Sequence, residues 1–463
     1  MTAGREACAR EIRRLAEWAA ATPASAIPRE TLARAVRVLA DDLAAIIGAC
    51  DEPEVARFHE RVVARAHSAE ATVFRGGRAR TDRISAAVAN AVAADWLELD
   101  EGYRPAPCHA GLYVLPALLA EAEARNLPFA ELLRALVLGY EIATRVARAW
   151  TPRALNMQSH GRYAALGAAA GVALARGAGA QLLLDALGTA VTLIGPSPRN
   201  HLAEGILSRN VWPAAGAWAG SMAVEWAECG IAGAPGAFHD VYSTVLGGEA
   251  RPRALTDGLG ERWAILDGYT KIYACCQHLH SAVEATVAMR DELLAQAVLE
   301  DVAAIRIETH ALALPLANAR PHTTLGAKFS MPHAIAAALV TGSGSADAFA
   351  AGTLAEPAIA RLRECVTIAP WRPELPPPND RPARVTVELR DGRKVQAECL
   401  SAAGGPDRPL PPGTVFEKMS ALAEPVYPGI RALFEVLADL PASRLAQGWA
   451  TIVGDFCNNG ETT

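Results

Sequence analysis

The stretch YAALGAAAGVALA, residues 163–175, carries no charge and is built mainly of alanine and glycine. Alanine has the highest helix propensity of all residues, so the stretch predicts a helix. A membrane-spanning helix needs about 20 apolar residues, and this one is shorter, so we expect it to be buried in protein. Gly167 and Gly171 are four residues apart, as are Gly216 and Gly220. This spacing puts them on one helix face, where small residues let backbones approach closely.

The sequence around this stretch predicts more helices up to about residue 265. Residues 29–47 place apolar side chains at helical spacing and end near Gly48. Similar patterns predict helices over residues 84–97, 114–124, 129–148, 181–194 and 212–228. No heptad repeat persists, so we expect one compact helical domain rather than a coiled coil.

The pattern changes after about residue 267. Residues 302–309 alternate as a strand does, and residues 383–389 and 395–400 predict a hairpin around Asp391-Gly392. Helices are expected between these strands, over residues 281–297, 332–340 and 346–363. From about residue 406 the chain is again helical, at 415–423 and 430–438. We therefore predict a mainly α fold, in which residues 1–266 and 406–463 form a large all-helical domain. Residues 267–405 form a smaller α+β domain inserted into it.

Composition excludes several classes of function. The net charge of −6 argues against a nucleic-acid-binding protein, which normally has a basic domain. The nine cysteines are scattered and odd in number, and the first fourteen residues are too charged for a signal peptide. We expect reduced thiols, a cytoplasmic location and no membrane partner.

Lysine is rare in this chain, with four lysines among 44 basic residues, and one of them begins KIYACCQHLH, residues 271–280. Lysine can shift its pKa and transfer a proton, whereas arginine stays charged. Histidine and cysteine also titrate near neutral pH. The segment is therefore a candidate reaction site; the alternative is a helix entry with cysteines in the core and histidines in solvent.

Three further groups could take part in chemistry. Asp95, Glu98, Asp100 and Glu101 precede Tyr103 and His109 in a loop between helices. His160 follows Ser159 at the start of a helix, where the helix dipole lowers the pKa of an imidazole. Arg209 precedes another helix and could hold a substrate carboxylate by two hydrogen bonds. The structural alternatives are solvated carboxylates, a helix cap and an ordinary surface arginine.

Metal and cofactor sites are not predicted. Adjacent Cys275 and Cys276, with His278 and His280, have poor spacing for one tetrahedral zinc ion. There is no P-loop, no strand-linked G-x-G-x-x-G and no G-x-S-x-G elbow in the proper context. The remaining histidines, lysine, arginine and carboxylates are suited to removing a proton next to a carboxylate.

The same residues carry a family resemblance. AVANAVAADWLELDE, residues 87–101, resembles the A-x-x-N-x-x-x-x-H-x-L-D-F-D-D block of the MmgE/PrpD family. His109 with VLPALLAEAE resembles the block that follows it. Further ordered matches lie at residues 39–48, 159–177, 271–285 and 329–339. This family includes 2-methylcitrate dehydratase, cis-aconitate decarboxylase and iminodisuccinate epimerase.

The resemblance implies a helical domain, a smaller lid, a homodimer and a site between the two domains. It implies catalytic roles for His109, His160 and Lys271 without a cofactor. The substrate-binding residues are then expected to be Glu98, Tyr103, Arg209, Cys275, His278 and His280. Three departures weigh against the substrates of the named members, cis-aconitate most of all. Asp95 replaces a histidine, Glu98 replaces an aspartate, and Arg209 replaces the lysine of decarboxylase-like members.

We therefore predict a cofactor-independent lyase (dehydratase or decarboxylase) or an epimerase. It would remove or return a proton next to a carboxylate of a small di- or tricarboxylic acid. In this scheme Arg209 anchors the substrate, one of the two histidines moves the proton, and Lys271 stabilises the developing charge. One alternative is a non-catalytic carboxylate-binding or scaffold relative. Another is a thiol- or metal-dependent enzyme that uses Cys275 and Cys276.

Overall fold

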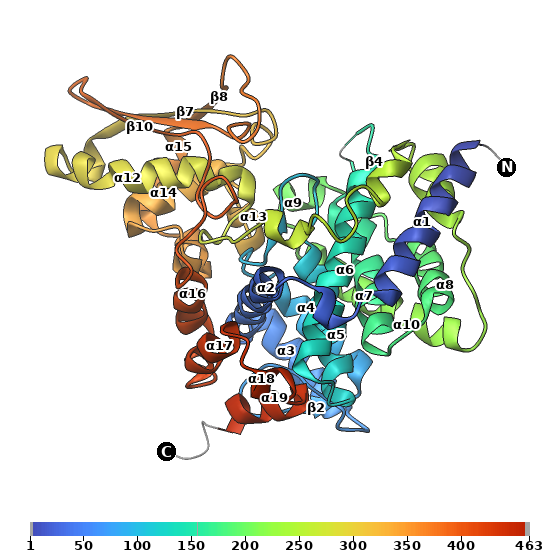
Figure 1. The fold of residues 1–463 in the computed structure, drawn as a ribbon. Coiled ribbons are helices and arrows are strands. Elements are labelled where there is room, and N and C mark those ends of the chain that lie inside the picture. Colours follow the sequence, from blue (N-terminus) through green and yellow to red (C-terminus); the bar gives the residue numbers. More distant parts are fainter. Residues whose placement is uncertain (1–2, 155, 459–463) are drawn as a thin grey trace.

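The structure is a computed structural model that describes residues 3–154 and 156–458. It is mainly helical, with 58% helix and 9% strand, as predicted. Eleven α-helices lie in the first part of the described chain, and Figure 1 shows their arrangement. They are α1 Ala3–Ala21, α2 Arg29–Gly48, α3 Pro53–Ala64, α4 Arg83–Ala94, α5 Ala110–Ala124, α6 Phe129–Ala149, α7 Ser159–Ala175, α8 Ala180–Ala190, α9 Asn200–Glu204, α10 Trp212–Glu228 and α11 Ala237–His239.

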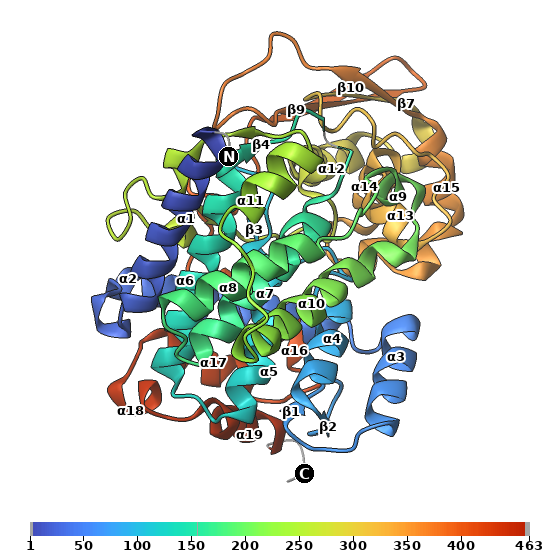
Figure 2. The ribbon, with the colours of Figure 1, turned by 90° about the vertical axis from the view of Figure 1, so that its right-hand side faces the viewer.

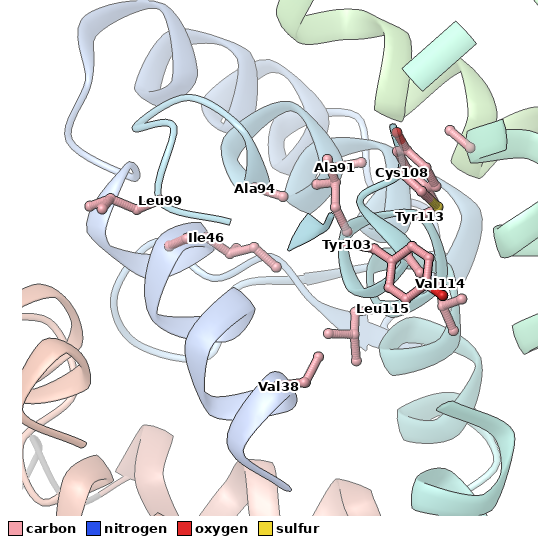
Figure 3. Packing of buried hydrophobic residues seen from close by; sticks show 14 of the residues in the cluster. Val38, Ile46, Ala91, Ala94, Leu99, Tyr103, Cys108, Tyr113, Val114 and Leu115 are labelled. Carbon is pink, nitrogen blue, oxygen red and sulfur yellow. The ribbon is translucent and has the colours of Figure 1, made fainter. Parts of the chain in front are cut away.

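Helix α7, which contains the alanine-rich stretch, is buried along its whole length. It packs against α5, α6, α8 and α10, in the middle of the helical part of the molecule (Figure 2). A Cβ atom at Gly220 would lie 2.6 Å from the backbone nitrogen of Ala169. Only glycine permits this approach of α10 to α7. Figure 3 shows a neighbouring part of the core, where apolar side chains such as Val38 of α2 and Leu115 of α5 are buried.

The first part of the chain is not wholly helical, which corrects the predicted all-helical domain. Three antiparallel ribbons of two residues per strand connect its loops. Strands this short have no alternating pattern to detect in the sequence. The pairs are β1 Ala71–Thr72 with β2 Arg80–Thr81, β3 Gly102–Tyr103 with β6 Gly268–Tyr269, and β4 Trp150–Thr151 with β5 Glu249–Ala250.

A mixed sheet of four strands follows in the order β10-β9-β7-β8. Strand β7 (Val302–Thr309) and the hairpin of β9 (Ala383–Leu389) and β10 (Lys394–Cys399) lie where the sequence predicts strands, to within a residue. Strand β8 (Val366–Pro370) was not predicted. It is an edge strand, runs parallel to β7 and ends in a proline, a residue that only the edge of a sheet tolerates.

Helices α12 (His280–Gln296), α13 (Thr324–Lys328), α14 (Met331–Thr341) and α15 (Pro357–Glu364) accompany this sheet, and α12 packs on β9 and β10. The single helix predicted over residues 346–363 is wrong. This stretch holds two short 3₁₀ turns, and α15 begins only at Pro357. Proline disfavours helical geometry in the residue before it and is well tolerated at the first helical position, so the helix starts there.

The end of the chain returns to its beginning. Helices α16 (Thr414–Ala423) and α17 (Ile430–Ala438) pack against α2, whereas α18 (Ala442–Leu445) and α19 (Trp449–Asn458) pack against α6 and α5. In Figure 1 these red helices lie beside the blue ones, and the sheet with its yellow and orange helices stands apart. None of the described helices has the length and apolar character needed to cross a membrane.

Candidate active site

The ribbon of β3 and β6 brings Asp100 and Lys271 together. Gly102 pairs with Tyr269 and Tyr103 pairs with Gly268 in antiparallel register. Two residues further along the same register, Asp100 comes opposite Lys271. The Lys271 Nζ atom lies 2.9 Å from Asp100 Oδ1 and 3.4 Å from Glu98 Oε2. The short β3–β6 ribbon thus joins two segments whose residues Asp100 and Lys271 are 171 residues apart in the sequence.

A tight loop returns the chain from Tyr103 to His109. The Tyr103 amide donates to the Cys108 carbonyl at 2.9 Å, so His109 lies beside the acidic residues, at the residue that precedes α5. His109 Nδ1 is 2.6 Å from Asp100 Oδ2 and 3.0 Å from the Glu101 carbonyl oxygen. Both neighbours are acceptors, so in the neutral tautomer of this ring the proton is on Nδ1 and the lone pair is on Nε2.

Arg209, in the 3₁₀ turn Leu207–Val211, forms buried ion pairs with Asp95 and Glu98. Its guanidinium also lies 5.3 Å from the centre of the Phe329 ring. Glu98 has a φ of 54°, a left-handed conformation that non-glycine residues rarely adopt. Strain of this kind concentrates at functional sites, where the surrounding contacts hold it in place.

His160 lies in the first turn of α7 and is completely buried. Its Nε2 atom is 2.7 Å from Asp95 Oδ2, and its Nδ1 atom is 3.0 Å from the Tyr113 hydroxyl. The rings of His160 and His109 have centroids 5.0 Å apart. We call the seven residues that meet here the cavity cluster; they are Asp95, Glu98, Asp100, His109, His160, Arg209 and Lys271.

Three of the four lysines bind residues 95–101, which we call the acidic loop. Lys271 contacts two of its carboxylates, as described above. Lys328 Nζ donates to the Trp96 carbonyl at 2.7 Å, and Lys418 Nζ donates to the Leu99 carbonyl. The fourth, Lys394, is exposed and pairs with Glu388 on the hairpin. Of these three lysines, only Lys271 was predicted as a site residue, although the rarity of lysine is a signal for the other two.

Burial and neighbouring charges shift the pKa values of residues in the cavity cluster in different directions. Burial opposes ionisation of Asp100, but Lys271 and then His109 outweigh it and hold the pKa of Asp100 well below its usual range. Burial likewise opposes the charge on Lys271, but Asp100 and Glu98 raise the pKa of this amine well above its usual value. The pKa of Asp95 is raised, by burial above all and then by Glu98. Near pH 7 the cluster therefore holds a protonated amine beside an ionised Asp100.

The helix dipole was expected to lower the pKa of His160. This pKa is indeed well below the usual value, but burial is the largest cause, followed by the charges of Arg209 and His109. His160 is therefore neutral. It can accept a hydrogen bond or orient its neighbours, but it does not carry a charge near neutral pH.

One face of the cavity cluster borders a cavity of about 720 Å³. This volume falls in the range of pockets that bind small molecules. Glu98, His109, Arg209 and Lys271 line it directly, and so does the predicted His278. Residues that lie between β3 and β6 in the sequence and residues that follow β6 both contribute to the cavity wall. The further polar residues of this wall include Asn156, Gln158, Arg162, Arg199, Cys276 and Gln277.

Four predicted site residues lie away from the cavity wall among the residues described. His160 is behind Asp95. Tyr103 stacks edge-to-face on Tyr140, with ring centroids 6.3 Å apart. Cys275 is fully buried while its neighbour Cys276 lines the cavity, because adjacent side chains point in different directions. His280 Nε2 is 3.0 Å from the Cys275 carbonyl oxygen, and His280 borders a separate small pocket.

The carboxylates of Asp95, Glu98 and Asp100 could in principle bind a cation, since their oxygens lie within 4.8 Å of one another. In this fold Arg209 and Lys271 contact the same three groups. These side chains supply the positive charge that a metal ion would otherwise bring. The predicted absence of a metal stays a prediction.

Two family models match most of the chain. The model of the MmgE/PrpD N-terminal domain matches residues 13–246, and that of the MmgE/PrpD C-terminal domain matches residues 273–439. The chain belongs to the MmgE/PrpD family. The C-terminal match of this MmgE/PrpD protein runs through α16 and α17, and Lys271 lies between the two matched regions.

Curated members of the family are similar to this MmgE/PrpD chain over most of their length. A "cis-aconitate decarboxylase-like protein oryM" of Aspergillus oryzae is 26% identical over 442 residues, which cover 89% of this chain and 90% of the relative. A cis-aconitate decarboxylase of Aspergillus terreus is 24% identical over 449 residues, which cover 88% of each chain.

Proposed function

We propose that this protein is a cofactor-independent lyase or isomerase that moves a proton next to a carboxylate of a small di- or tricarboxylic acid. One observation carries the proposal. His109 and Lys271, which are far apart in sequence, meet on the carboxylate of Asp100 at the wall of one cavity. A base and a protonated amine at the same cavity are the groups that this chemistry requires.

His109 is the better candidate for the group that takes the proton. Its side chain is 13% exposed and lines the cavity, whereas His160 is fully buried. Asp100 holds the Nδ1 proton, so the Nε2 lone pair is free to accept the α-proton and to return it. His160 then acts through its contact with Asp95 and is a positioning residue.

Lys271 serves as an acid or as a fixed positive charge, because its raised pKa keeps it protonated. Removing an α-proton places negative charge on the substrate as an enolate, which a nearby ammonium stabilises. Arg209 was expected to anchor the substrate. Its ion pairs with Asp95 and Glu98 support a different role, in which it fixes the acidic loop.

Residues 267–405 would act as the lid over this cavity, inserted between helical segments 1–266 and 406–463. Cys276, His278 and Phe329 come from this part and line the cavity. The packing of α16 and α17 on α2 supports the insertion. The expected homodimer is part of the proposal, and light scattering on the purified protein measures it directly.

The relatives named cis-aconitate decarboxylase favour a lyase reaction. The departures at Asp95, Glu98 and Arg209 favour a substrate other than cis-aconitate. A panel of aconitate, citrate, methylcitrate and aspartate-derived acids tests the proposal. Carbon dioxide release identifies a decarboxylase, water loss a dehydratase, and α-proton exchange without either product an epimerase.

His109→Asn should abolish turnover of whichever acid reacts, and the exposed His67→Asn provides a matched control that should keep it. An acid that stabilises the protein against heat and is never altered would instead indicate a carboxylate-binding relative. Full turnover by a folded His109→Asn variant would remove His109 from the scheme.

A further inference from the structure

We propose that Arg162 and Arg199 form an anion subsite that holds a second carboxylate of the substrate, away from the reacting carbon. The inference rests on the proposed function, in that it takes the cavity to be the substrate site. It adds the two residues that select for more than one carboxylate, neither of which belongs to the cavity cluster.

Both arginines line the same cavity as His109 and Lys271. Arg162 is in the first turn of α7, two residues after His160, and is only 8% exposed. Its Nε atom is buried and has no hydrogen-bond partner among the described residues. Since Arg162 lines the cavity, the remaining N–H groups of its guanidinium can donate to a ligand there.

Arg199 reaches the cavity from a different segment. It is half-buried and lines the cavity together with Cys276 and His278, and its charge lowers the pKa of both. The two arginines therefore approach the cavity from α7 and from the loop before α9.

The local fold holds this loop against the start of α7. The Gln158 amide donates to the Ser197 carbonyl at 2.9 Å, and the Arg199 amide donates to the Asn156 carbonyl at 2.9 Å. A Cβ atom at position 161 would lie 2.6 Å from the Gly195 carbonyl oxygen, so glycine is needed there. The backbone thus fixes Arg199 beside the first turn that carries Arg162.

Arg162 and Arg199 differ from the other positive charges of the cavity wall in having no carboxylate partner in the part of the chain that the structure describes. Arg209 and Lys271 are already paired with the carboxylates of the cavity cluster. Neither Arg162 nor Arg199 forms an ion pair with any residue in the described ranges 3–154 and 156–458. The cavity therefore has two uncompensated guanidinium groups, which bind a carboxylate through paired, charge-assisted hydrogen bonds.

Isothermal titration calorimetry with propane-1,2,3-tricarboxylate and butyrate, at fixed ionic strength, tests the subsite without any turnover. We expect the wild type to bind the triacid more tightly than butyrate. Arg162→Gln and Arg199→Gln should each weaken binding of the triacid by about 10- to 100-fold, the value of a hydrogen bond to a charged group. Their binding of butyrate should change less than about threefold on the same scale.

Arg153→Gln is the matched control, because Arg153 is exposed and does not line the cavity. Two independent variants guard against misfolding at one position, and thermal melts check each. Unchanged triacid affinity in both variants, an equal loss for butyrate, or no triacid binding by the wild type would each overturn the subsite. Triacid binding that depends on both arginines, in a protein that transforms no acid, would keep the subsite and reject the proposed function.

Discussion

The acidic loop supplies carboxylates to two buried groups of charged residues. One of them borders a cavity, and the other joins two helices. Asp95, Glu98 and Asp100 belong to the cavity cluster. Glu101, the next residue, faces the other way into what we call the packing cluster, formed by Asp41, Asp42, Glu101, Tyr140 and Lys418. Lys418 Nζ is 2.6 Å from Asp41 Oδ1, and the Glu101 amide donates to Asp42 Oδ1 at 2.7 Å.

Both clusters are buried, and each contains a lysine bound to an aspartate and to the acidic loop or its carboxylates. The cavity cluster borders a space that a small molecule can enter, whereas no residue of the packing cluster lines that cavity. The packing cluster joins α16 to α2 across 377 residues of sequence. Buried charge alone therefore does not distinguish a reaction site from a structural contact, and access to a cavity does.

Among the changes that compare the two clusters, removal of Lys271 should have the largest effect on activity. We expect Lys271→Met to lower kcat/KM by about 10²–10⁴-fold, because the developing enolate loses its positive neighbour. Steady-state assays on the folded fraction at low temperature measure this. Turnover within a few-fold of the wild type would show that Lys271 has no part in the reaction.

The matched change in the packing cluster should affect stability instead. Lys418→Met leaves Asp41 buried without its partner, which costs about 3–5 kcal/mol of unfolding free energy. Turnover per folded molecule should be preserved. Urea unfolding measures the first effect, and addition of Asp41→Asn should restore part of the loss. If Lys418→Met lost as much kcat/KM as Lys271→Met, the distinction between the clusters would fail.

Glu101 predicts a pH dependence that belongs to the packing cluster. Burial raises its pKa to about 7. The folded state then holds a proton that the unfolded chain has already lost, so stability is highest below about pH 4.5 and falls as pH rises through 7. The decrease amounts to about 3 kcal/mol. Glu101→Gln should flatten it in urea unfolding at pH 5 and pH 7.5, whereas equal pH dependence in both proteins would contradict the assignment.

The smallest effect concerns the support of His160. Tyr113→Phe removes the hydroxyl that lies 3.0 Å from His160 Nδ1. The loss of one neutral hydrogen bond should lower kcat by about tenfold or less and leave KM unchanged. A decrease as large as that of Lys271→Met would make His160 a catalytic rather than a positioning residue.

The sequence predicted the parts of this account that local patterns carry. Helix α7 follows from its alanine content, the hairpin of β9 and β10 from alternation and turn residues, and the candidate Lys271 from the scarcity of lysine. The candidate His109 follows from its place between the acidic loop and a helix. The pairing of Lys418 with Asp41 and the approach of Arg199 to Arg162 depend on long-range packing, which no spacing reveals. The exclusion of Cys275 and His280 from the cavity wall depends on side-chain direction, which is fixed only when the chain folds.

The most direct test is proton exchange at the substrate α-carbon in heavy water, followed by NMR with the reactive acid of the panel. Wild-type protein and Lys418→Met should both incorporate deuterium, and His109→Asn should not. Deuterium incorporation that continues in His109→Asn, or stops in folded Lys418→Met, would contradict the claim that the cavity cluster performs the chemistry.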